Sequence, residues 1–378
     1  MSRTNLRGRA FVEGEILGDV SVVVDSDGGL IDEVRVHRAA TESDQKELIV
    51  PAFIDVHVHG GAGSDFMDGS PEAIEAILRH HMRDGTAAVM ATTLSASRER
   101  LRKTVEAISE HAVDPDIAEI VGIHLEGPWI SAESAGAQDQ ASIRAPDVLE
   151  LKGLLALAPD LRWMVTLAPE IAGARNLIES FRHQVVFSIG HTHASFGEAA
   201  EALDLGASHF THLFNAMTPL HHREPGVVGA ALTSADATAE LIADGIHVHP
   251  VVLALATRLM AGRLALVTDA MRASGMPEGV YDLYDYRVTV RDGAARLDDG
   301  TLAGSTLTMR QAVCNMVELA GVPLEIVLPM ATETPARIAG VGDRKGRIRE
   351  GHEADLLVLS EKFEIRRMIL HGKELELA

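Results

Sequence analysis

Apolar runs alternate with segments of helical spacing through the central part of the chain. The uninterrupted runs are typical of buried strands, because a strand covered on both faces is apolar at successive positions. The intervening segments, such as 71–82, 98–111 and 196–205, have apolar residues three and four positions apart, as amphipathic helices do. The predicted strands are 48–58, 87–92, 120–125, 162–167, 185–189, 209–212, 240–243 and 264–268.

Eight strands that alternate with helices are typical of an α/β fold of the TIM (β/α)8 barrel type. The alternative is an open, doubly wound sheet, which normally has a glycine-rich phosphate turn after its first strand. The segment Gly60-Gly61-Ala62-Gly63-Ser64 matches such a turn only weakly. The pattern therefore favours the barrel, in which functional residues lie at the C-terminal ends of the strands.

Both ends of the chain contain short segments in which apolar and polar residues alternate, and turns separate these segments. Segments 6–12, 19–24 and 30–36 have this character, and so do 354–359 and 365–370. We expect the two ends to form one small, largely antiparallel β-sandwich domain, which brings the termini close together. The predicted division assigns 1–48 and 342–378 to this small domain and 49–341 to a barrel-shaped catalytic domain.

Composition and charge narrow the classes of partner. The 378-residue chain is 46% hydrophobic and carries a formal charge of −21, which argues against nucleic acid and against an anionic membrane surface. A small anionic substrate needs only a local cluster of cations and stays compatible with this charge. The one cysteine, Cys314, suggests a reducing compartment. With no signal-like segment and no apolar stretch of ~18 residues, a cytoplasmic location is expected.

Side chains able to bind a metal stand where the predicted strands end. An isolated His-x-His is more often a surface or core feature, and an aspartate after a strand commonly caps a helix. Here, however, six such groups fall at five strand ends, and a carboxylate after a buried strand is costly unless it is paired or metal-bound. Imidazoles and carboxylates suit zinc, iron or manganese. The groups that predict a metal centre are His57, His59, Glu126, His191, His212 and Asp269.

Around these residues, several longer blocks resemble the amidohydrolase superfamily and, within it, the family of N-acetylglucosamine-6-phosphate deacetylases. The His-Leu-Glu-Gly-Pro and His-Leu-Phe-Asn-Ala-Met blocks are distinctive of that family, whereas His-x-His marks only the superfamily. The resemblance runs over nearly the whole chain. Its blocks are 57–59, 124–128, 190–193, 211–217, 267–270, 302–305 and 351–356.

The resemblance implies a divalent metal, with one or two ions per subunit. Glu126, His191 and His212 would hold the main ion, while His57, His59 and Asp269, with Glu126 as a bridge, would hold a second. Family members that lack the His pair work with one ion, so its presence favours two. Zinc, iron, manganese and cobalt all accept this ligand set.

Strand 162–167 separates this chain from other superfamily branches. Those branches bridge their metals with a carboxylated lysine on the fourth strand, and Trp163-Met164-Val165-Thr166-Leu167 contains no lysine. The resemblance therefore favours Glu126 as the bridge over a dihydroorotase-like or hydantoinase-like centre.

The resemblance also implies a phosphorylated N-acetylhexosamine as substrate and a homodimer whose partner subunit contributes near the phosphate. Arg223 and His247 would contact the phosphate, because a guanidinium grips phosphate with two parallel hydrogen bonds. The backbone around Asn215 and Ala216 would assist, and Leu302 lies in a matching block. A surface arginine paired with the neighbouring Glu224 is the alternative for Arg223.

One position departs from the family pattern. Gln138 stands where the family usually has a histidine that polarises the substrate carbonyl or holds a sugar hydroxyl. A glutamine amide can donate a hydrogen bond but cannot become cationic. This substitution leaves the identity of the sugar open, including the galactosamine epimer.

The resemblance implies hydrolysis of the N-acetyl group of N-acetylglucosamine 6-phosphate, with glucosamine 6-phosphate and acetate as products. Asp269 would act as general base toward water and then as general acid toward the departing amine. His193 would serve as an oxyanion donor or in an ordinary structural role. The alternatives are another amidohydrolase that cleaves a cyclic or acyl amide, and a metal-stabilised barrel with a binding role.

Overall fold

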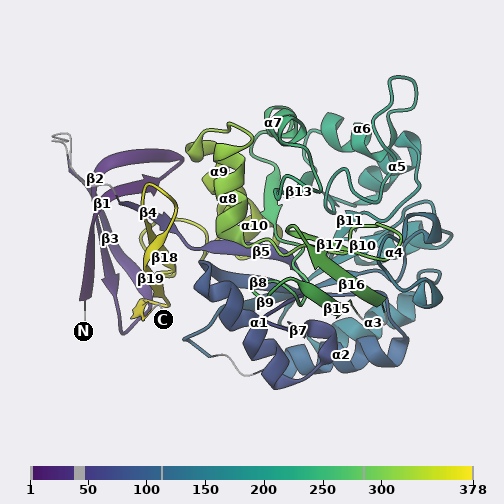
Figure 1. The fold of residues 1–378 in the computed structure, drawn as a ribbon, viewed down its shortest axis with the longest axis horizontal. Helices are drawn as coiled ribbons and strands as arrows, with labels where there is room; N and C mark the ends of the chain where they lie inside the picture. The colour runs from purple at the N-terminus through teal and green to yellow at the C-terminus, as the bar shows by residue number, and fades with distance from the viewer. Residues whose placement is uncertain (1–2, 38–46, 112–113, 284–285, 377–378) are drawn as a thin grey trace.

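The computed structural model describes residues 3–37, 47–111, 114–283 and 286–376, and its larger part is a parallel eight-stranded barrel. The strands are almost wholly buried, as expected for strands covered by helices on one face and by the barrel interior on the other. The predicted barrel is confirmed (Figure 1). In spatial order its strands are β5 (Phe53–Val58), β8 (Thr86–Thr93), β9 (Glu119–Glu126), β10 (Arg162–Leu167), β11 (Val186–Ile189), β12 (His209–Phe210), β13 (Thr238–Ile242) and β14 (Leu264–Val267).

Side chains and loop backbone join the first and last barrel strands. The hydroxyl and backbone N–H of Thr268, after β14, both donate to the carboxylate of Asp55 on β5. The backbone N–H of Asp269 donates to the carbonyl of His57, and that of His59 to the carbonyl of Ala270. Burial raises the pKa of Asp55 to about 7. These hydrogen bonds between β5 and the residues after β14 bring His57, His59 and Asp269 to one side of the barrel mouth.

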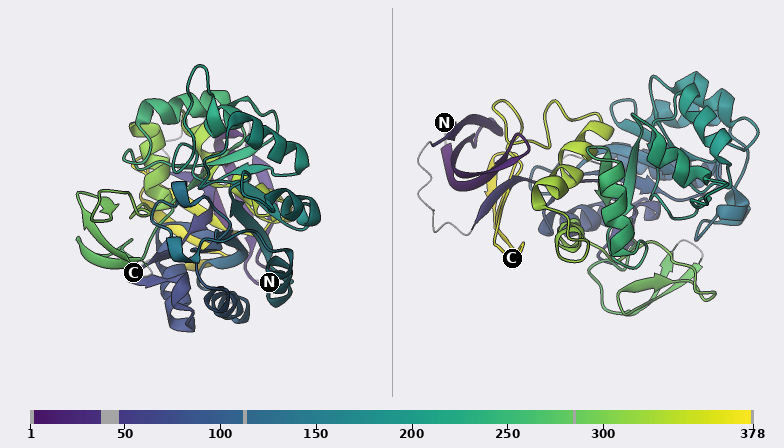
Figure 2. Two further views of the ribbon diagram at one scale, coloured as in Figure 1. Left: turned by 90° about the vertical axis from the view of Figure 1, so that its right-hand side faces the viewer. Right: turned by 90° about the horizontal axis from the view of Figure 1, so that it is seen from above.

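Ten α-helices in the described residues surround the barrel or extend it (Figure 2). The three helices singled out in the sequence are confirmed, and local signals fix where they begin. Ser70 caps α1 ahead of Pro71, and Ser195 forms a capping box with Glu198 at α5. The helices are α1 (Pro71–Arg83), α2 (Arg98–Glu110), α3 (Val148–Leu157), α4 (Ala174–Phe181), α5 (Phe196–Leu205), α6 (Gly226–Thr233), α7 (Pro250–Leu259), α8 (Met309–Glu318), α9 (Leu324–Ala331) and α10 (Glu333–Ile338).

Both ends of the chain contribute to one seven-stranded sheet beside the barrel (Figure 1). The sheet curls so that its first and last parts enclose a separate apolar core, and the backbone N–H of Ile31 on β3 donates to the carbonyl of His352 ahead of β18. The expected sandwich is thus made from one continuous sheet. Its strands, in spatial order, are β20 (Lys373–Leu375), β19 (Ile365–Leu370), β18 (Leu356–Leu359), β4 (Leu48–Pro51), β1 (Arg3–Val12), β2 (Glu15–Asp25) and β3 (Leu30–Val36).

The apolar run 48–58 was predicted to be one strand, and this is wrong. β4 pairs with β1 and β18 in the small sheet, whereas β5 pairs with β8 in the barrel. The break falls at Ala52, whose N–H donates to the carbonyl of Asp355 instead of continuing either ladder. Residues 48–51 therefore belong to the small sheet. The division into domains stays a prediction, and 38–46 of its first part lie outside the described residues.

Two small sheets were not predicted. β6 (Gly60–Gly61) pairs with β7 (Ser64–Asp65) just after the first His-x-His. β15 (Gly279–Leu283), β16 (Tyr286–Arg291) and β17 (Ala294–Arg296) form a three-stranded sheet between β14 and α8 that stands out from the barrel (Figure 2). Among the described helices, none is long and apolar enough to cross a membrane.

Candidate metal centre and active site

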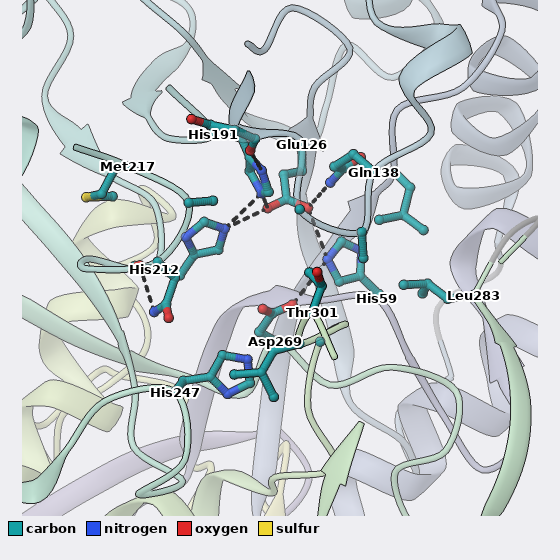
Figure 3. A pocket seen from close by; sticks show the side chains of 18 of the residues that line it. His59, Glu126, Gln138, His191, His212, Met217, His247, Asp269, Leu283 and Thr301 are labelled. Atoms are coloured by element: carbon teal, nitrogen blue, oxygen red, sulfur yellow. Dashed lines mark hydrogen bonds and ion pairs between the residues drawn. The ribbon is translucent and has the colours of Figure 1, made fainter. Parts of the chain in front are cut away.

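Three side chains from three strand ends converge at the barrel mouth. Glu126 ends β9, and His191 and His212 lie two residues after β11 and β12. The Nε2 atoms of His191 and His212 are 3.0 and 3.2 Å from Glu126 Oε1 and 3.0 Å from each other. Figure 3 shows both rings aimed at the same carboxylate. The structure thus brings the three predicted main ligands together.

The other three predicted ligands meet on the far side of Glu126. His57 Nε2 and His59 Nε2 are 3.2 Å apart and lie 3.5 and 3.3 Å from Asp269 Oδ1. Glu126 faces this group as well, with Oε2 3.3 Å from His59 Nε2. One carboxylate therefore stands between two sets of donors, which is the arrangement expected of a bridging ligand.

The chemistry of these donors fits a divalent cation. Nδ1 of His191 donates to the carbonyl of Ser134 at 2.9 Å, so in the neutral ring Nε2 presents a lone pair. That lone pair faces the Nε2 atom of His212, and two such atoms 3.0 Å apart attract each other only if a proton or a cation lies between them. All six residues are buried, and Asp269, the most exposed as a whole residue, is 8% exposed. Buried imidazole and carboxylate donors at this spacing suit zinc, iron, manganese or cobalt.

Three of the six predicted metal ligands have a strained backbone conformation. His191, His212 and Asp269 have φ values of +46°, +28° and +47°, in the left-handed region that residues with a Cβ rarely adopt. Each lies in the first turn after a barrel strand. Strain of this kind persists only where the surrounding structure holds it, and it is concentrated at functional sites.

The carboxylates of the site are held ionised. Burial alone would raise the pKa of Glu126, but His57 and His191 beside it bring that pKa well below its ordinary value. Burial likewise opposes ionisation of Asp269, and His57 and His59 outweigh it, so its pKa is lowered. Two buried carboxylates with lowered pKa values provide the negative charge that a divalent cation needs.

A cavity of about 590 Å³ opens directly onto these groups. This volume lies within the range of small-molecule sites. Five of the six predicted ligands line it, while His57 is fully buried beneath it. The lining also includes five of the predicted substrate residues, Gln138, Asn215, Ala216, His247 and Leu302.

Gln138 is fixed against the central carboxylate. Its Oε1 accepts the backbone N–H of Ser95 at 2.6 Å, which sets the orientation of the amide. Its Nε2 therefore points to Glu126 and donates to Oε2, also at 2.6 Å (Figure 3). A neutral glutamine thus holds the carboxylate that both donor groups share.

His247 is oriented by Asp244 across the pocket from Gln138. Asp244 accepts from Nδ1 of His247 at 2.6 Å and, through its other oxygen, from the backbone N–H groups of Ile246 and His247. The second nitrogen of the ring is left to face a ligand. The Asn215 amide instead donates to the carbonyl of His212, so this residue contributes mainly through its backbone turn.

Arg223 does not line the pocket of its own chain. It lies in an exposed turn before α6, with one guanidinium nitrogen 2.7 Å from Nε2 of His222. Among the residues that line the pocket, the one arginine or lysine is Arg296 on β17. Arg296 was not predicted as a site residue, because nothing in the sequence pattern indicated that 279–283, 286–291 and 294–296 form a sheet.

Two further residues complete the surroundings of the site. His193 is exposed and does not line the pocket, and its Nε2 lies 3.8 Å from a carboxylate oxygen of Glu133. Glu240 on β13 is fully buried and accepts from Nδ1 of His57 at 2.9 Å. Burial would raise the pKa of Glu240, but His57 and His209 lower it well below its usual value. Sequence patterning assigned Glu240 only to a strand.

Comparisons with known proteins agree with this geometry. Residues 48–375 match the model of the amidohydrolase family. An N-acetylgalactosamine-6-phosphate deacetylase from Escherichia coli O157:H7 is 38% identical, over 89% of each chain. An N-acetylglucosamine-6-phosphate deacetylase from Bacillus subtilis is 39% identical, over 86% of this chain and 84% of the relative.

Solved structures show the same likeness. A mutant N-acetyl-D-glucosamine-6-phosphate deacetylase from Mycobacterium smegmatis, in complex with N-acetyl-D-glucosamine-6-phosphate, superposes with a TM-score of 0.91 at 32% identity. The match covers 99% of both chains. The fold of this chain is therefore shared over nearly the whole of this relative.

Proposed function

Since this chain belongs to the amidohydrolase family, we propose that it is a metal-dependent deacetylase acting on N-acetylglucosamine 6-phosphate. It releases acetate from the N-acetyl group and leaves glucosamine 6-phosphate. The observation that carries this proposal is the meeting of Glu126, His191 and His212 within 3.0 to 3.2 Å in the wall of a pocket of about 590 Å³. Relatives that share this fold over most of their length bear the same activity in their names.

Amide hydrolysis at neutral pH needs an activated water and a stabilised oxyanion. When bound, a divalent cation lowers the pKa of a water molecule toward about 7 and polarises a carbonyl oxygen. Glu126, His191 and His212 would hold this ion, and His57, His59 and Asp269 a second one. The sugar portion fills the remaining pocket between Gln138 and His247.

Asp269 moves the proton in this proposal. Its ionised carboxylate lines the pocket and is 12% exposed, so it can accept a proton from water. The same proton then passes to the amine nitrogen as the carbon–nitrogen bond breaks, because a free amine leaves more readily than an amide anion. Asp269 returns to its ionised form after this transfer.

Gln138 and His247 orient the substrate. The Gln138 amide has one N–H directed at Glu126, which leaves its second N–H for the acetyl carbonyl or a sugar hydroxyl. As an imidazolium, His247 would donate Nδ1–H to Asp244 and Nε2–H to an anionic group such as the phosphate. These two residues would fix the two ends of the substrate.

The galactosamine epimer is a second candidate substrate. The 38% identical relative from E. coli O157:H7 is named for that sugar, and Gln138 stands where the family resemblance leads us to expect a histidine. Acetate release measured side by side on N-acetylglucosamine 6-phosphate and N-acetylgalactosamine 6-phosphate decides between them. A larger kcat/KM for the galactosamine epimer would overturn the proposed sugar.

The same assay tests the reaction class. We expect acetate release from the sugar phosphates and none from acylated amino acids or cyclic amides. Turnover restricted to acylated amino acids or cyclic amides would favour another amidohydrolase activity. Fully metal-loaded protein that hydrolyses no N-acyl substrate would favour a binding role for the barrel.

We further propose that the enzyme works as a homodimer in which Arg223 reaches the phosphate in the partner's pocket. Two observations support this: Arg223 is exposed in its own chain, and α7, which follows His247, exposes Val251, Leu255 and Leu259 at four-residue spacing. This spacing makes an apolar stripe of the kind that association buries.

An arginine comparison tests the phosphate contact. Arg223→Ala should raise KM for the phosphorylated sugar by at least about tenfold, because a bidentate charge-assisted contact is worth more than about 1.4 kcal/mol. KM for the unphosphorylated sugar should change little. The matched control is Arg296→Ala, which removes the pocket's own arginine. If this control alone raises KM, the phosphate is bound within one chain.

If the enzyme is a homodimer, light scattering should give a mass in solution of twice that of one chain. Mixing inactive Asp269→Asn chains with Arg223→Ala chains should return KM for the phosphorylated sugar to the wild-type value, since one pocket in the mixed dimer carries both intact residues. Absence of restoration in mixed dimers would contradict the shared site. The native metal and the cytoplasmic location remain predictions.

A further inference from the structure

Glu240, a fully buried carboxylate on β13, touches both donor groups of the site. Its Oε2 accepts from Nδ1 of His57 at 2.9 Å and from the backbone N–H of His212 at 3.0 Å. Its Oε1 accepts from Nε2 of His209 at 3.1 Å. A buried carboxylate is costly to desolvate and is kept only where its hydrogen bonds offset that cost. Two of the three bonds of Glu240 go to predicted metal ligands.

The bond to His57 selects one tautomer of that ring. A neutral imidazole carries one N–H, and the carboxylate accepts it at Nδ1. Nε2 is therefore left with its lone pair, and it faces Glu126 and Asp269 at 3.5 Å. With a partner that could not accept at Nδ1, the ring would place its proton on Nε2 and lose the lone pair on the side of the predicted ion.

The bond to His212 acts on the backbone. His212 has a φ of +28°, so its conformation needs external support. Glu240 supplies this support twice, because its side chain accepts the N–H of His212 and its own carbonyl accepts the N–H of Leu213 at 2.9 Å. The turn that aims His212 at Glu126 is thus fixed to β13.

A third residue holds Glu240 itself in place. Nε2 of His209 donates to Oε1, and Nδ1 of His209 lies 2.7 Å from the hydroxyl of Thr238. With Oε1 anchored in this way, Oε2 is directed to His57. Thr238, His209 and Glu240 all come from the neighbouring strands β12 and β13, which form a rigid support.

We infer that Glu240 is a positioning residue for the metal centre, which fixes the metal-binding tautomer of His57 and the backbone of His212 at the same time. This inference rests on the proposed metal-dependent function, since it concerns residues assigned there as ligands. Glu240 itself does not reach the pocket and is not a ligand in this assignment.

The group His57, His124 and Glu240 is also close enough to hold an ion of its own. The positioning role is favoured because Nδ1 of His57 is already bonded to Glu240, and Nε2 of His124 lies 2.7 Å from the hydroxyl of Thr166. The two readings differ in metal count, because a third site would give three ions per chain.

Zn²⁺ binding by the full chain, measured by competition with a chelator after metal removal, tests the inference. Glu240→Gln keeps the shape but has one accepting oxygen in place of two, so it cannot accept all three N–H groups that the carboxylate accepted. We expect Zn²⁺ to bind about 10–100-fold more weakly, the effect usual for losing such a hydrogen-bond partner. The visible absorption of Co²⁺-loaded protein should change as well, because the ligand geometry changes.

Thr166→Val is the matched control. It removes a buried hydrogen bond to His124 and Thr211 inside the same barrel and contacts none of the predicted ligands through its hydroxyl. Zn²⁺ affinity and the Co²⁺ spectrum should stay at wild-type values in this variant, even if its unfolding midpoint falls. This control separates a positioning effect from general destabilisation.

Equal Zn²⁺ affinity in wild type and Glu240→Gln, or three ions per wild-type chain, would overturn the inference. Wild-type protein that binds no Zn²⁺ would instead overturn the proposed function. If Glu240→Gln does not fold, Glu240→Asp decides, because the shorter side chain keeps the charge but draws the carboxylate back from His57 and from the N–H of His212. Weaker Zn²⁺ binding then supports the inference, and unchanged binding contradicts it.

Discussion

His191, His212 and Asp269 share a backbone conformation that their side chains disfavour. Each directly follows a short barrel strand, and the left-handed turn bends its side chain back over the mouth. The residue types and their strand-end positions were readable from the sequence. The sign of φ was not, because it is imposed by contacts such as that between Glu240 and the N–H of His212.

At the residue scale, Asp269→Asn separates proton transfer from metal binding. We expect turnover to fall by at least ~100-fold, because an amide cannot accept the proton of the attacking water. The ion held by Glu126, His191 and His212 should remain, since Asp269 is outside that group. Acetate release and metal content, measured on the same sample, check both statements. Wild-type turnover in the variant would remove Asp269 from its assigned role.

Other residue-level features were beyond sequence reasoning. Glu240 looks like an ordinary strand residue, and its contact with His57 joins positions 183 residues apart in the chain. Arg296 lies in a segment without any predicted function, yet it lines the pocket. In contrast, Gln138 was predicted as a substrate-binding residue from its place in the sequence, and the structure shows that it donates a short hydrogen bond to Glu126.

At the element scale, α1 is fixed to the loop that follows the first His-x-His. His81 is fully buried near the end of α1, and its Nε2–H donates to the carbonyl of Gly60 at 2.9 Å. Burial lowers the pKa of His81 to about 3, with a further contribution from neighbouring His80. The neutral ring is therefore part of what holds Gly60, next to His59, in place.

This contact predicts an acid-sensitive stability. The folded pKa of His81 lies below the unfolded value of about 6.5, so its contribution is complete above pH 6.5 and is lost as the pH falls toward 3. The free energy of unfolding should fall by up to about 1.4 kcal/mol per pH unit from this group. His81→Gln keeps an N–H donor and does not titrate.

Urea denaturation of metal-free wild type and His81→Gln, at several pH values below neutrality, measures the difference. The variant should lose less stability on acidification, while the other titrating groups act equally in both proteins. Parallel pH profiles would show that His81 is not buried in its neutral form.

The break between β4 and β5 shows where element prediction reached its limit. Residues 48–58 are continuously apolar, and periodicity gives no sign that the two halves serve different sheets. Only the partner strands decide this, since β18 comes from the far end of the chain. The barrel strands themselves were predicted well, because burial on both faces leaves a clear apolar run.

At the scale of the whole molecule, a charged cluster joins the small sheet to the barrel. Lys345 is 1% exposed at its side chain, and its Nζ lies 2.9 Å from Glu119 at the start of β9. The same nitrogen is 2.5 Å from Glu353 and 2.6 Å from Asp355, just ahead of β18. These carboxylates raise the pKa of Lys345 despite its burial, so it is charged.

Removal of this cation should destabilise the entire chain. Lys345→Met leaves three carboxylates together without their central partner, a change that costs about 3–5 kcal/mol for a buried group. The matched control is Arg366→Met, which breaks an exposed pair with Glu364 and should cost less than about 1 kcal/mol. Urea denaturation at neutral pH gives both values. Equal, small losses would mean that the cluster does not couple the two parts.

That both ends of the chain form one sheet could be predicted from the sequence, because alternating segments flank the barrel pattern on both sides. The cluster around Lys345 was not, since 119 and 345 are far apart in the sequence and neither stands in a distinctive motif. Long-range contacts of this type depend on the assembled fold.

Acetate release from N-acetylglucosamine 6-phosphate, followed after metal removal and again after metal is restored, tests the central claim most directly. Because Glu126, His191 and His212 are proposed to act through a shared divalent cation, stripped protein should be inactive and the restored protein active. Undiminished acetate release from protein shown to be free of metal would contradict the account, as would inactivity of fully loaded protein toward both sugar epimers.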